Sequence, residues 1–205
     1  MILKNILRNL ILYKIYIFKI LIFEIIYFIK GYKGNKFRAS KDEIINDNIP
    51  CPFYFLHHIK KLLLKEDFNT FVDFGCGSGR AIDFFNKNFP NKNFVGIEYY
   101  NANIEYCKKY FKNKKNIKLV HNDFLKYDFL QDNPDCYFFN EPISSYQTLY
   151  DVLKKIVYEN SKKSKILLIF VNCNTNNFEI LKKTTCIEKY EISDRKGYSI
   201  YCINK

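Results

Sequence analysis

The 205-residue sequence contains no tryptophan and a single methionine, and its seven cysteines include no CxxC or CxxxC pair. Structural zinc sites and dithiol redox sites use closely spaced cysteines, so this spacing argues against both. The three histidines, His57, His58 and His121, are too few and too separated to form a ligand set. We therefore expect no metal site, and we expect the cysteines to be small core residues of a protein in a reducing compartment.

Long uncharged hydrophobic runs are also missing. The N-terminal segment MILKNILRNLILYKIYIFKILIFEIIYFIK is rich in Ile, Leu and Phe, but charged residues interrupt it every few positions. A membrane-spanning helix needs about 20 predominantly apolar residues. Lys14, Lys19 and Glu24 would each cost about 3 kcal/mol at the bilayer centre, which offsets the gain from their apolar neighbours. No small-residue cleavage site follows the segment, which argues against a cleaved secretory signal.

Positive charge is concentrated in this same region. Of the net charge of +12, residues 1–41 contribute +8, with Glu24 as the single acid among them. At about 100° per residue, the cations of residues 1–30 share less than half of the helix surface. These cations are Lys4, Arg8, Lys14, Lys19 and Lys30. A basic stripe beside a wide apolar face is typical of a helix that lies in a membrane interface.

The pattern leaves three arrangements of this segment open. The helix can lie on an anionic membrane surface through residues 1–30, pack on its own domain or in a homodimer, or span a membrane. We divide the chain into a hydrophobic, basic helical arm, residues 1–41, and one folded domain, residues 42–205.

The domain alternates short apolar strands with helices. After the segment IPCPF and a short helical run, strands are predicted at 70–74, 93–97, 117–121, 135–139 and 165–172, and helices at about 79–88, 102–112 and 145–160. This alternation predicts an α/β fold with a mostly parallel sheet covered on both faces. Asn101 is expected to cap the second of these helices. Two β-rich runs around a glycine turn near the C-terminus predict an antiparallel hairpin at the sheet edge.

The stretch FVDFGCGSGR lies between the first strand and the first helix of the domain. Its glycines, at every second position, are Gly75, Gly77 and Gly79. Glycines allow a sharp turn and let a ligand approach the main chain, and ligands of open parallel sheets bind beyond the carboxyl ends of the strands. The spacing differs from the G-x-G-x-x-G of nicotinamide enzymes, and the carboxylate of Asp73 suits a cationic amine better than a phosphate. Glu98, at the end of the next strand, can accept both hydroxyls of a ribose.

With these residues the sequence resembles the class I S-adenosylmethionine-dependent methyltransferases, from about Pro50 to the C-terminus. VDFGCGSGR is similar to their first motif, VGIEYYNANIEYCKKY to their second and IKLVHNDFLKYDF to their third. The nearer resemblance is to small bacterial methyltransferases of unassigned substrate, and a looser one is to lysine methyltransferases of the ATP synthase c-subunit type. The resemblance implies a Rossmann-like fold and S-adenosyl-L-methionine as cofactor. From the cysteines and the N-terminal arm we expect a cytoplasmic enzyme, peripheral at the inner face of the membrane if the arm binds lipid.

The resemblance also implies roles for individual residues. It places the methionine moiety of the cofactor against the glycine loop, the ribose on the acid of the second motif, and the adenine beside the third motif. The implied cofactor-binding residues are Asp73, Gly75, Cys76, Gly77, Gly79, Glu98, Asp123 and Phe124. Arg80 is expected to pack at the start of its helix, near the cofactor loop.

The segment after the fourth strand, FFNEPIS, departs from the family pattern. Amino-methylating enzymes of DNA or glutamine have Asn-Pro-Pro-Tyr or Asp-Pro-Pro-Tyr there, whereas this chain has Asn140, Glu141, Pro142 and Ile143. Asn140 can accept a hydrogen bond from an amine and Glu141 can attract its cationic form, so these two are the predicted catalytic residues.

The missing aromatic residue also bears on the acceptor. A flat nucleobase would lack a stacking partner at Ile143, so we expect a protein side chain, a lipid or a glycan as acceptor rather than a nucleic acid. Two alternatives stay open, a non-catalytic interaction module with this fold and a nucleic-acid methyltransferase.

Overall fold

The computed structural model describes residues 2–32, 50–123, 125–142, 145–171, 187–191 and 198–204, with the backbone alone for 2–13 and for the last two ranges. The described helices are α1 (Ile2–Ile29), α2 (Phe53–Leu63), α3 (Arg80–Asn88), α4 (Asn101–Tyr110) and α5 (Tyr146–Glu159). The described strands are β1 (Thr70–Phe74), β2 (Asn93–Glu98), β3 (Ile117–His121), β4 (Cys136–Asn140), β5 (Lys165–Val171), β6 (Ile187–Glu191) and β7 (Tyr198–Asn204).

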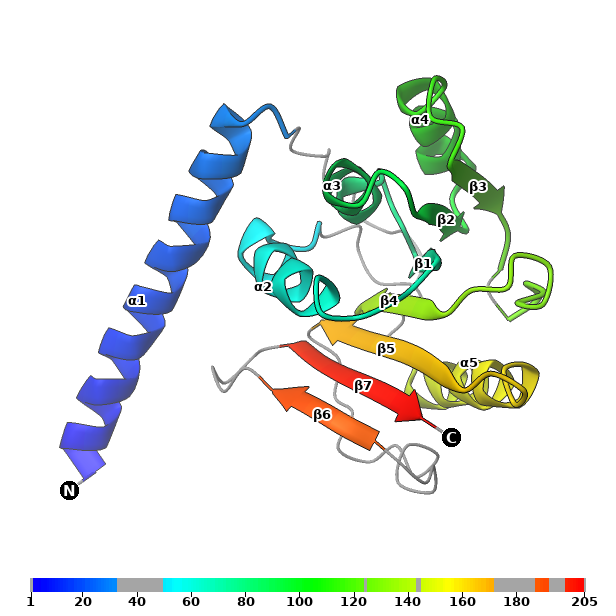
Figure 1. Ribbon diagram of the computed structural model, residues 1–205. Coiled ribbons are helices and arrows are strands. Elements are labelled where there is room, and N and C mark those ends of the chain that lie inside the picture. Colours follow the sequence, from blue (N-terminus) through cyan, green and yellow to red (C-terminus); the bar gives the residue numbers. More distant parts are fainter. Residues whose placement is uncertain are drawn as a thin grey trace.

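These strands form one sheet in the order β3-β2-β1-β4-β5-β7-β6 (Figure 1). The pairs from β3 to β5 are parallel, and β7 runs antiparallel to both β5 and β6. From β1 the chain proceeds outward to β2 and β3, then returns to place β4 on the other side of β1. The order therefore reverses between β1 and β4, and their carboxyl ends flank the crevice in which open α/β sheets bind ligands.

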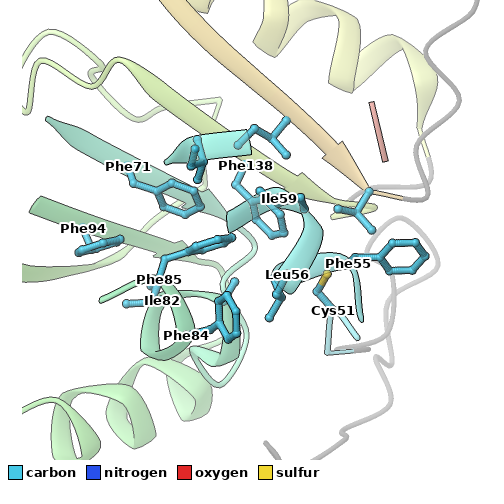
Figure 2. Close-up of a cluster of buried hydrophobic side chains, with 14 of the residues drawn as sticks. Cys51, Phe55, Leu56, Ile59, Phe71, Ile82, Phe84, Phe85, Phe94 and Phe138 are labelled. Atoms are coloured by element: carbon cyan, nitrogen blue, oxygen red, sulfur yellow. The ribbon is translucent and has the colours of Figure 1, made fainter. Parts of the chain in front are cut away.

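Helices cover both faces of the sheet because strand residues point alternately to either side. Phe71 and Phe138 face a cluster that includes residues of α2 and α3, as Figure 2 shows. Val72 and Phe139 face the opposite cluster, which includes the buried side of α5. The mostly parallel, doubly covered sheet predicted from the sequence is thus confirmed. The uniformly buried pattern of β1 follows from this coverage.

One side of α1 packs on the domain along α2 (Figure 1). The contacts are largely aromatic: the ring centroids of Phe23 and Tyr54 lie 5.4 Å apart, and those of Tyr27 and Phe53 lie 5.1 Å apart. The Tyr27 hydroxyl also hydrogen-bonds His57 Nδ1 at 2.5 Å. Among the described residues, no helix is long and apolar enough to cross a membrane. The predicted boundary between arm and domain, at residues 41 and 42, lies outside the described residues.

Most predicted elements agree with the observed ones to within two residues, but the cap of α4 was assigned to the wrong residue. Asn101 is the first residue of the helix, and the N-cap position belongs to Tyr100, whose side chain makes no capping hydrogen bond. The Tyr100 amide instead donates to Glu98 Oε1 at 2.8 Å. The acid at the end of β2 therefore fixes the entry into α4.

Candidate cofactor site

The glycine loop folds back over the carboxyl end of β2. The amides of Gly75 and Cys76 both donate to the Ile97 carbonyl, at 2.9 and 3.0 Å, and the Gly79 amide donates to the Cys76 carbonyl at 2.8 Å. All three glycines have positive φ, at 67°, 53° and 82° along the chain. Glycine adopts this left-handed conformation without the steric cost that a Cβ atom brings. The loop thereby turns from β1 directly into α3.

Two of the glycines are also required by the chain's own packing. A Cβ on Gly75 would lie 3.0 Å from Pro142 Cβ, and a Cβ on Gly79 would lie 2.6 Å from the Phe111 ring. The sequence pattern alone suggested that the loop leaves room for a ligand. At these two positions the structure adds a second reason for glycine, because the segment after β4 and the end of α4 pack closely against the loop.

Glu98 holds this loop from the neighbouring strand. Its carboxylate is buried and accepts hydrogen bonds from the amides of Gly77 and Tyr100, each at 2.8 Å. Burial raises the pKa of Glu98, and the hydrogen bonds from the two amides and from Asn103 partly oppose that shift.

Asp73 is a second buried acid at the same edge of the sheet. Burial, and then the nearby charge of Glu98, raise the pKa of Asp73 well above its ordinary value. A carboxyl group kept in such surroundings is costly to ionise, and groups with strongly shifted pKa values cluster at functional sites. A cationic ligand beside Asp73 would favour its charged form.

A small pocket opens beside Asp73, at the point where the strand order reverses. Its lining residues are Pro50, Cys51, Asp73, Gly75, Cys76, Ser78, Arg80, Ala81, Phe138 and Asn140. Within the described part of the chain, Ser78 Oγ and Arg80 Nε are buried without a hydrogen-bond partner. Buried polar atoms are nearly always satisfied in proteins, so these two suit a polar ligand. The lining combines an acid with a base, which matches the ammonium and carboxylate of an amino-acid moiety.

The arginine of this pocket is held by the N-terminal helix. Arg80 Nη1 contacts both carboxylate oxygens of Glu24, at 3.0 and 3.1 Å, and its guanidinium carbon lies 4.7 Å from the centre of the Phe53 ring. Glu24 Oε1 also accepts the Phe53 amide at 2.9 Å, at the first residue of α2. One side chain of α1 therefore ties together the N-terminal ends of α2 and α3.

Neither Glu24 nor Ser78 is predicted from the sequence as a functional residue, and Arg80 is predicted only to pack at the start of its helix, near the cofactor loop. A usable signal for Glu24 was present, because it is the single acid among the first 41 residues. A lone acid in a basic, apolar segment invites a search for a cationic partner. For Ser78 the sequence holds no comparable signal, since its position in a glycine loop is ordinary for serine.

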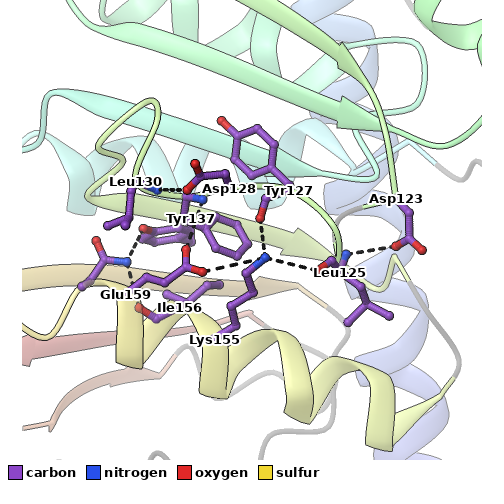
Figure 3. A network of polar contacts seen from close by, with 11 residues as sticks. Asp123, Leu125, Tyr127, Asp128, Leu130, Tyr137, Lys155, Ile156 and Glu159 are labelled. Carbon is purple, nitrogen blue, oxygen red and sulfur yellow. Dashed lines mark hydrogen bonds and ion pairs between the residues drawn. The ribbon is translucent and has the colours of Figure 1, made fainter.

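The loop that follows β3 carries the predicted adenine-side residues and is fastened to α5 (Figure 3). Lys155 Nζ donates to the carbonyls of Leu125 and Tyr127, at 3.2 and 2.6 Å, and Glu159 Oε2 accepts the Phe129 amide at 3.1 Å. Asp123 begins this loop and accepts the Leu125 amide at 3.0 Å. Asp123 is not among the lining residues of the pocket, and Phe124 lies outside the described residues.

The predicted catalytic pair is divided by the fold. Asn140 ends β4 and lines the pocket together with Asp73. Glu141 is exposed, is not among the lining residues, and adopts a positive φ of 44° that is uncommon for a residue with a Cβ. Ile143, on which the argument against a nucleobase depends, lies outside the described residues. No group of three or more His, Cys, Asp or Glu among the described residues could hold a metal ion.

Comparison with known proteins agrees with this geometry. Residues 71–157 match the family model of a methyltransferase domain. The stretch from β1 to most of α5 is thus similar to methyltransferase domains. The chain is similar in fold to the methyltransferase domain of bacterial CtHen1-C, with a TM-score of 0.55 at 14% identity, covering 73% of this chain and 95% of that one. An RNA methyltransferase from Salinibacter ruber, solved with S-adenosyl-L-homocysteine, gives a TM-score of 0.55 at 12% identity, covering 76% of this chain and 93% of that one.

Among curated proteins, the chain is similar to a tRNA (guanine-N(7)-)-methyltransferase of Buchnera aphidicola subsp. Schizaphis graminum. The two are 32% identical over 66 residues, which is 31% of this chain and 28% of the relative. The chain thus matches less than a third of that relative's length. The methyltransferase-type α/β fold predicted from the sequence is confirmed by these comparisons.

Proposed function

We propose that this chain transfers a methyl group from S-adenosylmethionine to an acceptor that is not a nucleic acid. The observation that carries the proposal is the pair of buried acids, Asp73 and Glu98, on either side of a glycine loop at the reversal point of the sheet. The pocket, which Asp73 lines and Glu98 does not, has an acidic and a basic side, as an amino-acid moiety requires.

Each polar group of the site has a partner in this proposal. Asp73 holds the ammonium of the methionine moiety, and the partnerless Ser78 Oγ and Arg80 Nε take its carboxylate. Glu98 accepts the ribose hydroxyls, and Asp123 with Phe124 borders the adenine. The cofactor supplies an activated methyl group on a sulfonium, so the protein mainly aligns the acceptor and excludes water.

In this proposal Asn140 meets the acceptor. It ends β4 on the pocket, where its amide oxygen can accept a hydrogen bond from an amine and orient the lone pair of the nitrogen. Glu141, exposed at the next position, attracts a cationic lysine or amino sugar before the proton is lost. The acceptor classes that suit these two groups are protein side chains, lipids with amino headgroups and glycans.

Titration calorimetry with S-adenosylhomocysteine tests the cofactor assignment. Asp73→Asn should abolish binding and Glu98→Gln should weaken it at least tenfold, because each loses a charge-assisted contact. Asp67→Asn, at an exposed acid whose lysine partner is 3.4 Å away, serves as the matched control and should bind as the wild type does. Absence of binding by the folded wild-type protein would refute the assignment.

Transfer of radiolabelled methyl groups into a fractionated cell lysate tests the acceptor. Label is expected in protein, lipid or glycan, and Asn140→Ala should abolish it while changing the affinity for S-adenosylhomocysteine by no more than a few fold. Equal transfer by Asn140→Ala would remove this residue from the reaction.

Nucleic acid is the second candidate acceptor. A relative named for tRNA methylation, a structural neighbour named for RNA methylation and the net charge of +12 favour it. Label that appears in purified RNA or DNA, and disappears on nuclease treatment, would select this candidate over the first.

A further inference from the structure

The outer face of α1, directed away from α2, is apolar and open to solvent. Phe18, Phe28 and Ile29 have 64%, 73% and 77% of their surface exposed. The exposed large hydrophobic residues of this helix are Ile15, Ile17, Phe18, Leu21, Ile22, Ile25, Ile26, Phe28 and Ile29. Single exposed hydrophobic residues are ordinary on protein surfaces, but a contiguous row of this size marks a surface that another body covers.

The contacts of α1 with its own domain do not account for this row. Tyr16, Ile20, Phe23 and Tyr27 form the inner face, which packs on the domain. At about 100° per residue, Phe18, Ile25 and Ile29 lie on the opposite side of the helix. The helix is therefore apolar on two sides, of which the fold uses one.

Two partners could cover the outer face, a second copy of the chain or a lipid surface, and the charge of the helix favours one of them. Lys14 and Lys19 on α1, and Lys30 directly after its last residue, are exposed. Glu24, the single acid in residues 1–41, is engaged by Arg80. A second copy would bring another basic surface against this one, with no acid left to balance it, whereas an anionic lipid surface complements the lysines.

We propose that the outer face of α1 binds reversibly to an anionic membrane surface, with its apolar side chains in the headgroup region and its lysines at the phosphates. Long lysine side chains can reach the headgroups while their stems lie along apolar surface. This geometry belongs to a helix that lies in the interface plane, which fits a helix whose other side is fixed to a domain.

The attachment would also place the cofactor site close to the lipid. Arg80 lines the pocket and contacts Glu24 of α1 at 3.0 Å, and a helix with its side chains is about 10 Å across. The pocket then lies about one helix diameter from the surface. This consequence rests on the proposed methyl transfer, but lipid binding by α1 does not.

Vesicle co-sedimentation of the full chain tests the inference. The probes are vesicles of phosphatidylcholine alone and of phosphatidylcholine with about a third phosphatidylglycerol, at low and high salt. We expect binding to the anionic vesicles that weakens as salt rises. Lys14→Gln, Lys19→Gln and Lys30→Gln should each weaken it by roughly fivefold, the share of one lysine near such a surface.

The contribution of the apolar side chains to vesicle binding is tested with a matched pair of double variants. Phe18→Gln with Ile25→Gln removes two outer-face residues. It should weaken vesicle binding by a hundredfold or more, because burial of each apolar side chain contributes about tenfold to the affinity. Leu64→Gln with Leu130→Gln removes two residues that are exposed to a similar degree, 65% and 66%, elsewhere on the domain, and should change nothing. Circular dichroism and S-adenosylhomocysteine affinity, expected to be unchanged in all variants, show that the fold and the cofactor site are intact.

Three results would overturn the inference. The first is wild-type protein that ignores anionic vesicles, and the second is equal binding by the two double variants. The third is dimerisation in light scattering that the Phe18→Gln, Ile25→Gln variant abolishes, because the outer face would then be covered by a second copy. Wild-type protein that binds anionic vesicles but not S-adenosylhomocysteine would contradict the proposed methyl transfer and leave the lipid binding by α1 supported.

Discussion

Replacement of Glu24 by Gln should destabilise the whole domain, although Glu24 lies in an N-terminal helix far from the sheet in sequence. The substitution removes the charge that faces Arg80 and keeps an oxygen that can still accept the Phe53 amide. In the ion pair, the Arg80 side chain has 12% of its surface exposed and that of Glu24 has 31%. The contribution of this ion pair to the free energy of unfolding should therefore lie between those of surface pairs and fully buried pairs.

The magnitude follows from these two limits. Exposed pairs contribute about 0–1 kcal/mol, whereas removal of one partner from a buried pair costs about 3–5 kcal/mol. We expect about 2 kcal/mol for Glu24→Gln. Glu24→Ala should cost about 1 kcal/mol more, because the first amide of α2 then also loses its acceptor.

Urea unfolding of the purified protein provides the assay. With a slope of about 2 kcal/mol per molar urea, the Glu24→Gln midpoint should fall by about 1 M. Glu105→Gln is the control, since Glu105 pairs with Lys108 at 2.9 Å and both side chains are more than half exposed. The control should lose less than about 0.5 kcal/mol. If both variants unfold at the same urea concentration, the link between α1 and Arg80 does not stabilise the fold.

Three further predictions concern pH and the loop beside α5. The pKa of Asp73 is raised in the folded protein, so the Asp73 carboxyl stabilises the fold below about pH 3.8, and this stabilisation is lost as pH rises through the folded pKa. The urea midpoint of Asp73→Asn should therefore exceed that of the cofactor-free wild type, by a margin that grows toward neutral pH. The pKa of His57 is lowered to about 4, chiefly by burial, so relative to His57→Gln the wild type should lose stability as pH falls from about 6.5 to 4. A wild-type midpoint that tracks either variant at every pH would contradict the corresponding shift. Lys155→Met should weaken S-adenosylhomocysteine binding several fold in calorimetry by releasing the loop after β3, and an equal loss in Lys154→Met, whose amine stacks on Tyr150, would show that the effect is not specific to the loop.

The sheet and its glycine loop were predictable because local sequence determines them. The residues of β1 form an apolar run that ends at an acid and a glycine, and the apolar positions of α3 recur at helical spacing. Such signals need no knowledge of distant contacts. The position of Glu98 was predictable for the same reason, since it directly follows the next predicted apolar strand in the sequence.

The contacts that complete the site join residues far apart in the chain. Glu24 and Arg80 are 56 positions apart, and the Gly75 position depends on the approach of Pro142, 67 residues later. In the sequence, Glu24 interrupts an apolar helix and lies outside its basic stripe. From the sequence alone it is therefore interpreted as a charge that opposes membrane insertion. In the fold it is the counter-ion of an arginine that lines the pocket. A charged residue inside an apolar helix is therefore best interpreted by asking which buried cation the rest of the chain leaves unbalanced, and here the arginine that follows the glycine loop supplies the answer.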